Sequence, residues 1–187
     1  MRATPAHLAT TAVAVLATAL ALTSCDDSGD GGEAAGGGKD AKQSAVTACA
    51  AGHVAVRVGP GNAAPAAGDT GNIPVTVTNS GSADCTLKGF PRTELTGDGT
   101  AWTVARQPGA HAETVTLKPD EAASFTLTYV RGTAGGTGDS VVVKTLKVAL
   151  PGADGGSETS PWTYGEVALK SKDTVDASVS PFRTAGD

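Results

Sequence analysis

The stretch that decides the fold is NIPVTVTNS, residues 72–80, in which apolar and polar side chains alternate. Successive side chains of a β-strand point to opposite faces, so Ile73, Val75 and Val77 share one face. Thr76 and Thr78 lie on the other face. One apolar and one polar face are typical of a strand that covers a core on one side and meets water on the other. The stretch therefore predicts a half-buried β-strand.

The same period of two recurs on both sides of this stretch. HVAVRV, residues 53–58, and SFTLTY, residues 124–129, each place three apolar side chains on one face. Further strands are predicted at 93–96, 101–106, 113–117, 141–150, 164–169 and 174–180. Within 141–150 the apolar face changes parity, which predicts a bulge or a bend. No window of the domain has the pattern of an amphipathic helix.

The segments between these strands are rich in turn residues. They are GPGN (59–62), NSGS (79–82), GDG (97–99), KPDE (118–121), GTAGGTGD (132–139) and PGADGGSE (151–158). In NSGS, the residue types that tolerate φ > 0 predict a tight reversal. Many short strands with a turn signal about every ten residues predict an all-β, immunoglobulin-like β-sandwich. A β-barrel is the alternative.

Residues 1–24 have the features of a lipoprotein signal peptide. Arg2 is the only charge before Cys25, and residues 8–22 contain only Ala, Leu, Val and Thr. This apolar run is shorter than the roughly 20 residues that a membrane-spanning helix needs. Leu22-Thr23-Ser24-Cys25 resembles the bacterial lipobox, in which the cysteine thiol takes a diacylglyceryl group and becomes the new N-terminus. Two acyl chains give stable anchoring, so we expect lipid attachment at Cys25 to the outer, extracytoplasmic face of the cell membrane.

Residues 25–44 predict a flexible, acidic, Gly-rich linker that starts at the lipidated cysteine. The segment has five carboxylates, two lysines and no aromatic side chain, so it cannot bury enough apolar surface to order itself. Residues 45–187, which follow it, have the length of one domain. Their charges are mixed and form no basic block, which argues against a nucleic-acid partner.

The chain has three cysteines, an odd number for an exported protein. If Cys25 carries the lipid, Cys49 and Cys85 remain as a pair, and an oxidising compartment favours a disulfide between them. Two free buried thiols are the alternative. A bond across this sequence separation is worth about 4 kcal/mol in the chain-entropy treatment.

From residues 73–99 onward, the chain carries a set of motifs that resembles those of a known family. The motifs are Asn79-Ser80-Gly81, Cys85-Thr86-Leu87 and Gly89-Phe90-Pro91, followed by LKPDEAASFTLTY from 117, LKVALPG from 146 and VDASVSPF from 175. Together they resemble the bacterial lipoprotein family catalogued as domain of unknown function 4232. Gly89-Phe90-Pro91 also predicts a corner at which Phe90 turns into the core and Pro91 ends ladder pairing.

The resemblance implies an exported, commonly lipid-anchored β-sandwich of high-GC Gram-positive bacteria. It implies no established activity. Members often carry a second cysteine pair, with one cysteine shortly before the strand that corresponds to LKVALPG. Here that region reads SVVVKT, so this chain departs from the family pattern.

The sequence predicts a protein that is not an enzyme and has no cofactor. No nucleophile elbow, phosphate loop or dinucleotide fingerprint occurs, and His53 and His111 have no spacing that suggests a metal site or a base–nucleophile pair. Two classes of function remain. The first is a non-enzymatic binding module that engages an envelope protein or a cell-wall polymer. The alternative is a small-ligand or metal-binding carrier.

Trp102, Trp162 and Tyr164 are the candidate binding residues, because amphipathic aromatic side chains are enriched in binding hot spots. In a domain with so few aromatic residues, the competing interpretation is that these three side chains belong to the core.

Overall fold

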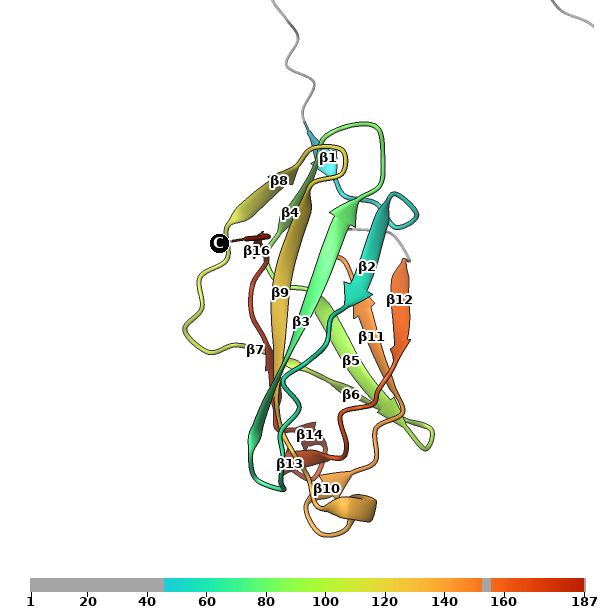
Figure 1. Ribbon diagram of the computed structural model, residues 1–187, viewed down its shortest axis with the longest axis vertical. Coiled ribbons are helices and arrows are strands. Elements are labelled where there is room, and N and C mark those ends of the chain that lie inside the picture. The colour runs from blue at the N-terminus through green and yellow to red at the C-terminus, as the bar shows by residue number, and fades with distance from the viewer. Residues whose placement is uncertain (1–45, 153–155, 187) are drawn as a thin grey trace, which may run out of the picture. The chain divides into compact units, whose positions relative to one another are not determined.

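The computed structural model describes residues 46–152 and 156–186, and the described part of the chain is built almost entirely from β-strands. Figure 1 shows two layers, with β2, β3 and β9 in front and β5, β6, β11 and β12 behind them. The strands are β1 (Thr47–Ala48), β2 (Val54–Val58), β3 (Thr70–Asn79), β4 (Cys85–Lys88), β5 (Arg92–Gly97), β6 (Thr100–Thr103), β7 (Ala105–Arg106), β8 (Thr114–Leu117), β9 (Ala122–Val130), β10 (Ser140–Val141), β11 (Thr145–Ala149), β12 (Ser157–Pro161), β13 (Val167–Ser171), β14 (Thr174–Val175), β15 (Ala177–Val179) and β16 (Arg183–Thr184). A short 3-10 helix, η1, spans Ala134–Gly136.

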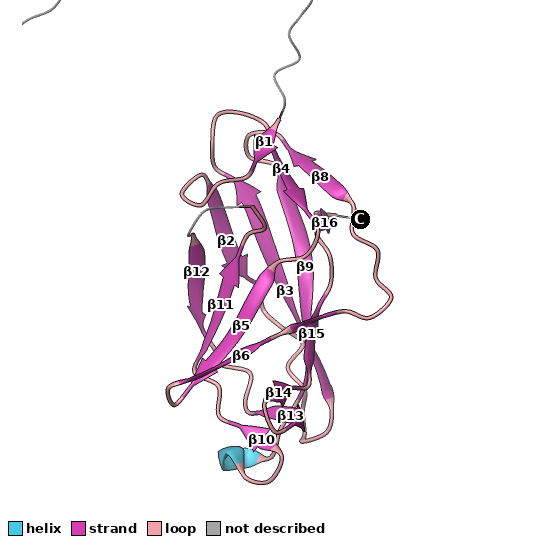
Figure 2. Ribbon diagram, turned by 180° about the vertical axis from the view of Figure 1, so that it is seen from behind, coloured by secondary structure: helices cyan, strands magenta, loops and turns pink. Residues whose placement is uncertain are grey.

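The strands form two large sheets and two small ones. The front sheet has the order β2-β3-β9-β15-β7, with β16 also paired to β9, and the back sheet has the order β12-β11-β5-β6. The small sheets, β1-β4-β8 and β10-β13-β14, lie at opposite ends of the molecule (Figure 2). The prediction of an all-β, sandwich-like fold is confirmed. Within the described residues, no helix is long and apolar enough to cross a membrane.

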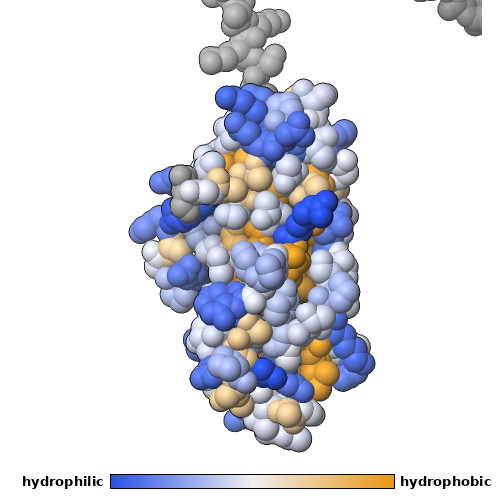
Figure 3. Space-filling model, in the orientation of Figure 1, coloured by the Kyte–Doolittle hydropathy of each residue, from blue (hydrophilic) through white to orange (hydrophobic). Residues whose placement is uncertain are grey.

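The core lies between the two large sheets and is centred on β3 and β9. These strands pair over nine residues, and Ile73 lies opposite Leu127 and Val75 opposite Phe125. All four of these side chains are buried, as the alternation predicts. The other face of the same strands carries threonine and serine. On the face drawn in Figure 3, hydrophobic surface gathers near the middle of the molecule, at the level of β2.

Pro74 explains why β2 is short although its neighbour β3 is long. The Gly59 amide donates to the Pro74 carbonyl at 2.8 Å, but Pro74 has no N–H with which to return a bond to Gly59. The ladder between the two strands therefore ends at this point, and β2 ends at Val58.

The turn predicted at GDG is confirmed. Asp98 and Gly99 form a two-residue connection between β5 and β6, and their φ angles are 47° and 80°. Positive φ at both central positions is the requirement of a type I′ hairpin, which Asp-Gly meets at low cost.

The reversal at Asn79 is present, but the reason predicted for it is wrong. Neither Asn79, Ser80 nor Gly81 has a positive φ. Instead the buried Asn79 side chain holds the turn, because its Oδ1 accepts from the Gly81 amide at 2.9 Å. Its Nδ2 donates to the carbonyls of Ala83 and Leu117. Asparagine is needed here for its side-chain hydrogen bonds.

Three predicted strands are split in two. Residues 101–106 divide at Val104 into β6 in the back sheet and β7 in the front sheet, so the chain crosses between layers there. Residues 141–150 divide into β10 and β11, which is the bend that the change of parity predicts. Residues 174–180 divide at Asp176 into β14 and β15. The alternation of apolar and polar residues indicates which face of a strand is buried, but it does not indicate which sheet the strand joins.

Two features of the domain differ from the sequence prediction. The predicted turn segment ends at 158 and no strand is predicted at 159–161, but Ser157–Pro161 form β12, an edge strand that pairs with β11. Its sequence, SETSP, has no alternation of apolar and polar side chains, because most of this strand is exposed to solvent. Phe90 is only half-buried, and the Arg106 guanidinium covers its ring at 5.3 Å. Its neighbour Pro91 is buried instead.

Candidate functional site: a basic hollow on the back sheet

Four charged side chains border a hollow of ≈ 420 Å³ on the outer side of the back sheet. We call it the basic hollow. Its lining residues are Pro91, Arg92, Thr93, Glu94, Thr103, Val104, Arg106, Lys147 and Ala149. They come from β5, β6, β7 and β11, so strands that are distant in sequence build one wall.

Strand register places the cations of the hollow. Arg92 lies opposite Ala149, and Lys147 lies opposite Glu94. Because the buried residues of β5 and β11 are those of the other parity, these four side chains project from the outer face. Ala149 is the small member of the group, so it leaves space beside Arg92.

The hollow is locally basic although the chain has a formal net charge of −5. Arg92, Arg106 and Lys147 face a single carboxylate, Glu94, whose Oε2 lies 3.3 Å from the Lys147 Nζ. The Arg106 guanidinium is held over the Phe90 ring, which limits the positions it can take. Guanidinium and ammonium groups that border one hollow can bind carboxylate or phosphate oxygens.

Two of the predicted aromatic residues, Trp162 and Tyr164, lie together, and Trp162 is buried whereas Tyr164 is partly buried. The Trp162 ring stacks edge-on against Tyr129 and Tyr164, with both centroid distances 5.1 Å. The Trp162 indole donates to the Gly165 carbonyl, and the Tyr164 hydroxyl donates to the Gly59 carbonyl at 3.1 Å. Burial, with a smaller contribution from Tyr129, raises the pKa of Tyr164 above 10.0. The cluster therefore joins the loops at residues 59–64 and 162–166.

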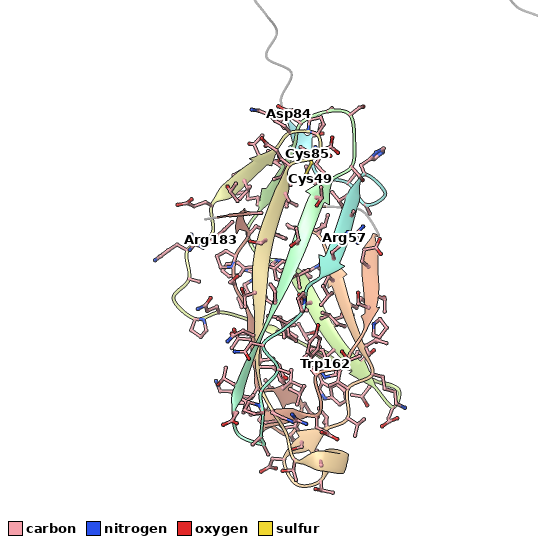
Figure 4. The ribbon with its side chains drawn as sticks, viewed as in Figure 1. Cys49, Arg57, Asp84, Cys85, Trp162 and Arg183 are labelled. Carbon is pink, nitrogen blue, oxygen red and sulfur yellow. A yellow bond between two sulfur atoms is a disulfide. The ribbon has the colours of Figure 1, made fainter. Side chains whose placement is uncertain are left out.

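Trp102 lies apart from this cluster. It sits on the edge strand β6 opposite Leu95 and is partly buried against the core. Figure 4 shows Trp162, and with it the aromatic cluster, well below the two cysteines.

The two histidines are not brought together. His53 borders a hollow of ≈ 210 Å³ that Asp84 also lines, and His111 borders another of ≈ 180 Å³ with Glu113. Within residues 46–152 and 156–186, no three His, Cys, Asp or Glu side chains are grouped so that they could hold a metal ion.

The predicted disulfide is confirmed. Cys49 and Cys85 are bonded, with their Cα atoms 4.8 Å apart, and both are buried. The bond joins the segment after β1 to the start of β4. The Cys49 amide donates to the Thr86 carbonyl and makes a second link between the same two segments. Figure 4 shows it at the end of the molecule where β1 lies. Cys25, the predicted lipidation site, lies outside the described residues.

The cations of the hollow were not identified from the sequence. Arg92, Arg106 and Lys147 are separated by 14 and 41 residues, so the sequence shows only scattered mixed charges. Their convergence depends on the crossing at Val104 and on the pairing of β5 with β11. The one local signal was the alternation of Lys147 with Leu146 and Val148, which marks Lys147 as outward-facing.

Residues 49–183 match the model of a protein family described as a domain of unknown function, DUF4232. The match covers more than half of the chain and includes the disulfide, the aromatic cluster and the whole basic hollow. No curated protein matches the sequence.

Proposed function

The chain belongs to the DUF4232 family, and from this premise we propose that it is a non-enzymatic binding module displayed as a lipoprotein on the outer face of the cell membrane. The basic hollow is the observation that carries the binding role. An acidic group of an envelope protein or a cell-wall polymer is the ligand that its three cations favour.

The proposed anchor rests on the sequence around Cys25. A short apolar run precedes it, small residues lead into it, and the disulfide between the other two cysteines leaves it as the unpaired one. Residues 1–24 act as the signal peptide and residues 25–44 as the tether in this proposal. A tether of about 20 flexible residues holds a domain on the order of 25 Å from its anchor.

We also propose that the sandwich is immunoglobulin-like. Two large sheets with mostly antiparallel pairing, and the crossing of the chain between them at Val104, support this proposal. The disulfide differs from the bond of antibody domains, which joins the two large sheets, because it connects the residue after β1 to the first residue of β4.

Replacing Cys25 by alanine tests the anchor. We expect Cys25→Ala to lack the mass of the diacylglyceryl group and to be released from the membrane or left uncleaved, because alanine has no thiol to acylate. The measurement is the intact mass of the cell-derived protein together with its partition into detergent. Ser24→Ala keeps a small residue beside the cysteine and serves as the matched control. A Cys25→Ala protein with the mass and partition of the wild type would exclude the anchor.

A charge reversal in the hollow tests the binding role. Arg92→Glu should weaken binding of a polyanion by roughly tenfold and reduce its dependence on salt, because one of three cations becomes an anion. Titration of the purified chain with polyglutamate and with polyphosphate distinguishes a carboxylate ligand from a phosphate ligand. Lys88→Glu makes the same change in charge at an exposed position outside the hollow. Equal losses in the two variants would show that only net charge matters and would contradict the assignment.

A further inference from the structure

The front sheet ends one strand earlier than the back sheet. β2 is the last strand of the front sheet, and β12 is the last strand of the back sheet. Figures 1 and 2, seen from opposite sides, both show β12 at the margin of the molecule, beyond β2. Within the described residues, no strand pairs with β2 on the side away from β3.

The backbone of β2 has unused hydrogen-bonding groups on this side. The Ser80 amide donates to the His53 carbonyl and the Gly59 amide to the Pro74 carbonyl, and bonded pairs in an antiparallel ladder alternate. Residues 55 and 57 therefore bond to β3. The N–H and C=O groups of Val54, Val56 and Val58 point away from β3, and none of them bonds to another described residue.

The side chains around this position also suit an added strand. Val54, Val56 and Val58 pack against the core but remain partly exposed at its edge. Beneath them, Glu158 and Ser160 share the core-facing parity of β12, since they lie opposite the buried Val148 and Leu146. Arg57 projects from the opposite, outer face of β2 (Figure 4).

The two neighbouring edges differ in how they are protected. On β12 the Trp162 amide donates to Lys144, so the alternate residues Ser157, Thr159 and Pro161 direct their backbones outward. Pro161 has no N–H to offer a further strand, which is a common way to block an edge. β2 contains neither proline nor lysine, and its register with β3 is continuous.

Contacts at both ends define the length of the vacant position. At one end, Gly156 lies so close to Ala51 that a Cβ on Gly156 would meet the Ala51 Cβ at 1.6 Å. At the other end, the Tyr164 hydroxyl bonds to the Gly59 carbonyl. The five residues of β2 lie between these contacts, and five residues of a strand span about 17 Å. We call this position, bounded by Val54–Val58 and by Glu158 and Ser160, the strand slot.

We propose that the strand slot binds an extended segment of a partner protein, which adds to β2 as a seventh strand of the front sheet. The segment has apolar residues and one cation on the face toward the core, where the cation meets Glu158. It has an acidic residue on the outer face beside Arg57.

Hydrogen exchange of the purified full chain with a synthetic peptide tests the proposal. The probe is a capped heptapeptide with valine at positions two and six, lysine at four, and threonine or glutamate elsewhere. In the free protein the amides of Val54, Val56 and Val58 should exchange quickly and those of Ala55 and Arg57 slowly. Saturating peptide should slow the three valine amides by roughly tenfold or more, because each gains a ladder bond.

Proline substitutions on the two edges provide a matched pair of variants. Val56→Pro removes an outward N–H that the fold does not use and should weaken peptide binding by roughly tenfold. Thr159→Pro makes the same change on β12 and should leave binding unchanged. Equal affinities for both variants, or no slowing at the three valine amides, would overturn the proposal. Protection of these amides without peptide, together with dimers in sedimentation, would overturn it in favour of self-pairing.

A charge exchange keeps the test valid if Val56→Pro fails to fold. Glu158→Lys should weaken binding of the lysine peptide, and a peptide with glutamate at position four should bind this variant better than it binds the wild type. The same preference for the lysine peptide in both proteins would overturn the assignment of Glu158. The basic hollow takes no part in this measurement, so its outcome is independent of the ligand proposed there.

Discussion

Replacing Cys49 and Cys85 together by alanine is expected to lower the free energy of unfolding by about 4 kcal/mol. The bond closes a loop with a sequence separation of 36 residues, and its loss returns that conformational freedom to the unfolded chain. For a domain of this size, the change corresponds to a decrease in Tm of roughly 10–15 °C. Chemical denaturation followed by circular dichroism measures the difference.

Reduction of the wild-type protein is the control for this prediction. The reduced wild type lacks the bond but keeps both sulfur atoms, so it should unfold at nearly the same denaturant concentration as the double variant. A double variant with the stability of the oxidised wild type would contradict the prediction. A double variant far less stable than the reduced wild type would assign the loss to packing, since both cysteines are buried.

The sequence was sufficient for the strands whose two faces differ. Val75 and Phe125 alternate with threonine and serine, and they are paired across the centre of the front sheet. The short connection at Asp98 and Gly99 was equally predictable, because Asp-Gly strongly prefers one turn type. In both cases the signal lies within a few residues of the chain.

The basic hollow and the strand slot depend on how strands that are distant in sequence pair with one another. This pairing cannot be predicted from a single sequence. Arg92 and Lys147 share the hollow because β5 pairs with β11 at one register, and a shift of either strand by one residue would turn its own cation toward the core. The strand slot lies where β2 and β12 form neighbouring sheet edges, and the polar sequence of β12 resembles a loop. Trp162 was identified from its residue type alone, and residue type cannot separate a binding aromatic from a buried one.

The aromatic cluster gives the last prediction, which separates these two roles for Trp162. Trp162→Ala should destabilise the domain by about 3–5 kcal/mol, because a buried ring is lost together with its edge-on contacts to Tyr129 and Tyr164. The Gly165 carbonyl would also lose its indole donor. Trp102→Ala, on an edge strand, should cost only about 1 kcal/mol, since its ring is partly in solvent. Urea denaturation followed by circular dichroism gives both values without relying on tryptophan fluorescence.

A third variant distinguishes the ring from its hydrogen bond. Trp162→Phe keeps an aromatic ring against Tyr129 but removes the donor to Gly165, so it should cost about 1–3 kcal/mol, less than alanine does. Nearly equal costs for Trp162→Ala and Trp102→Ala would contradict the structural role of Trp162. Because Trp162 and Tyr164 hold the loop that begins at Gly59 beside the strand slot, Trp162→Ala should also speed exchange at the Gly59 amide, which donates to the Pro74 carbonyl. The cluster would then support binding by fixing the end of β2, and the exposed parts of Trp102 and Tyr164 would be the predicted aromatic surface left for a direct contact.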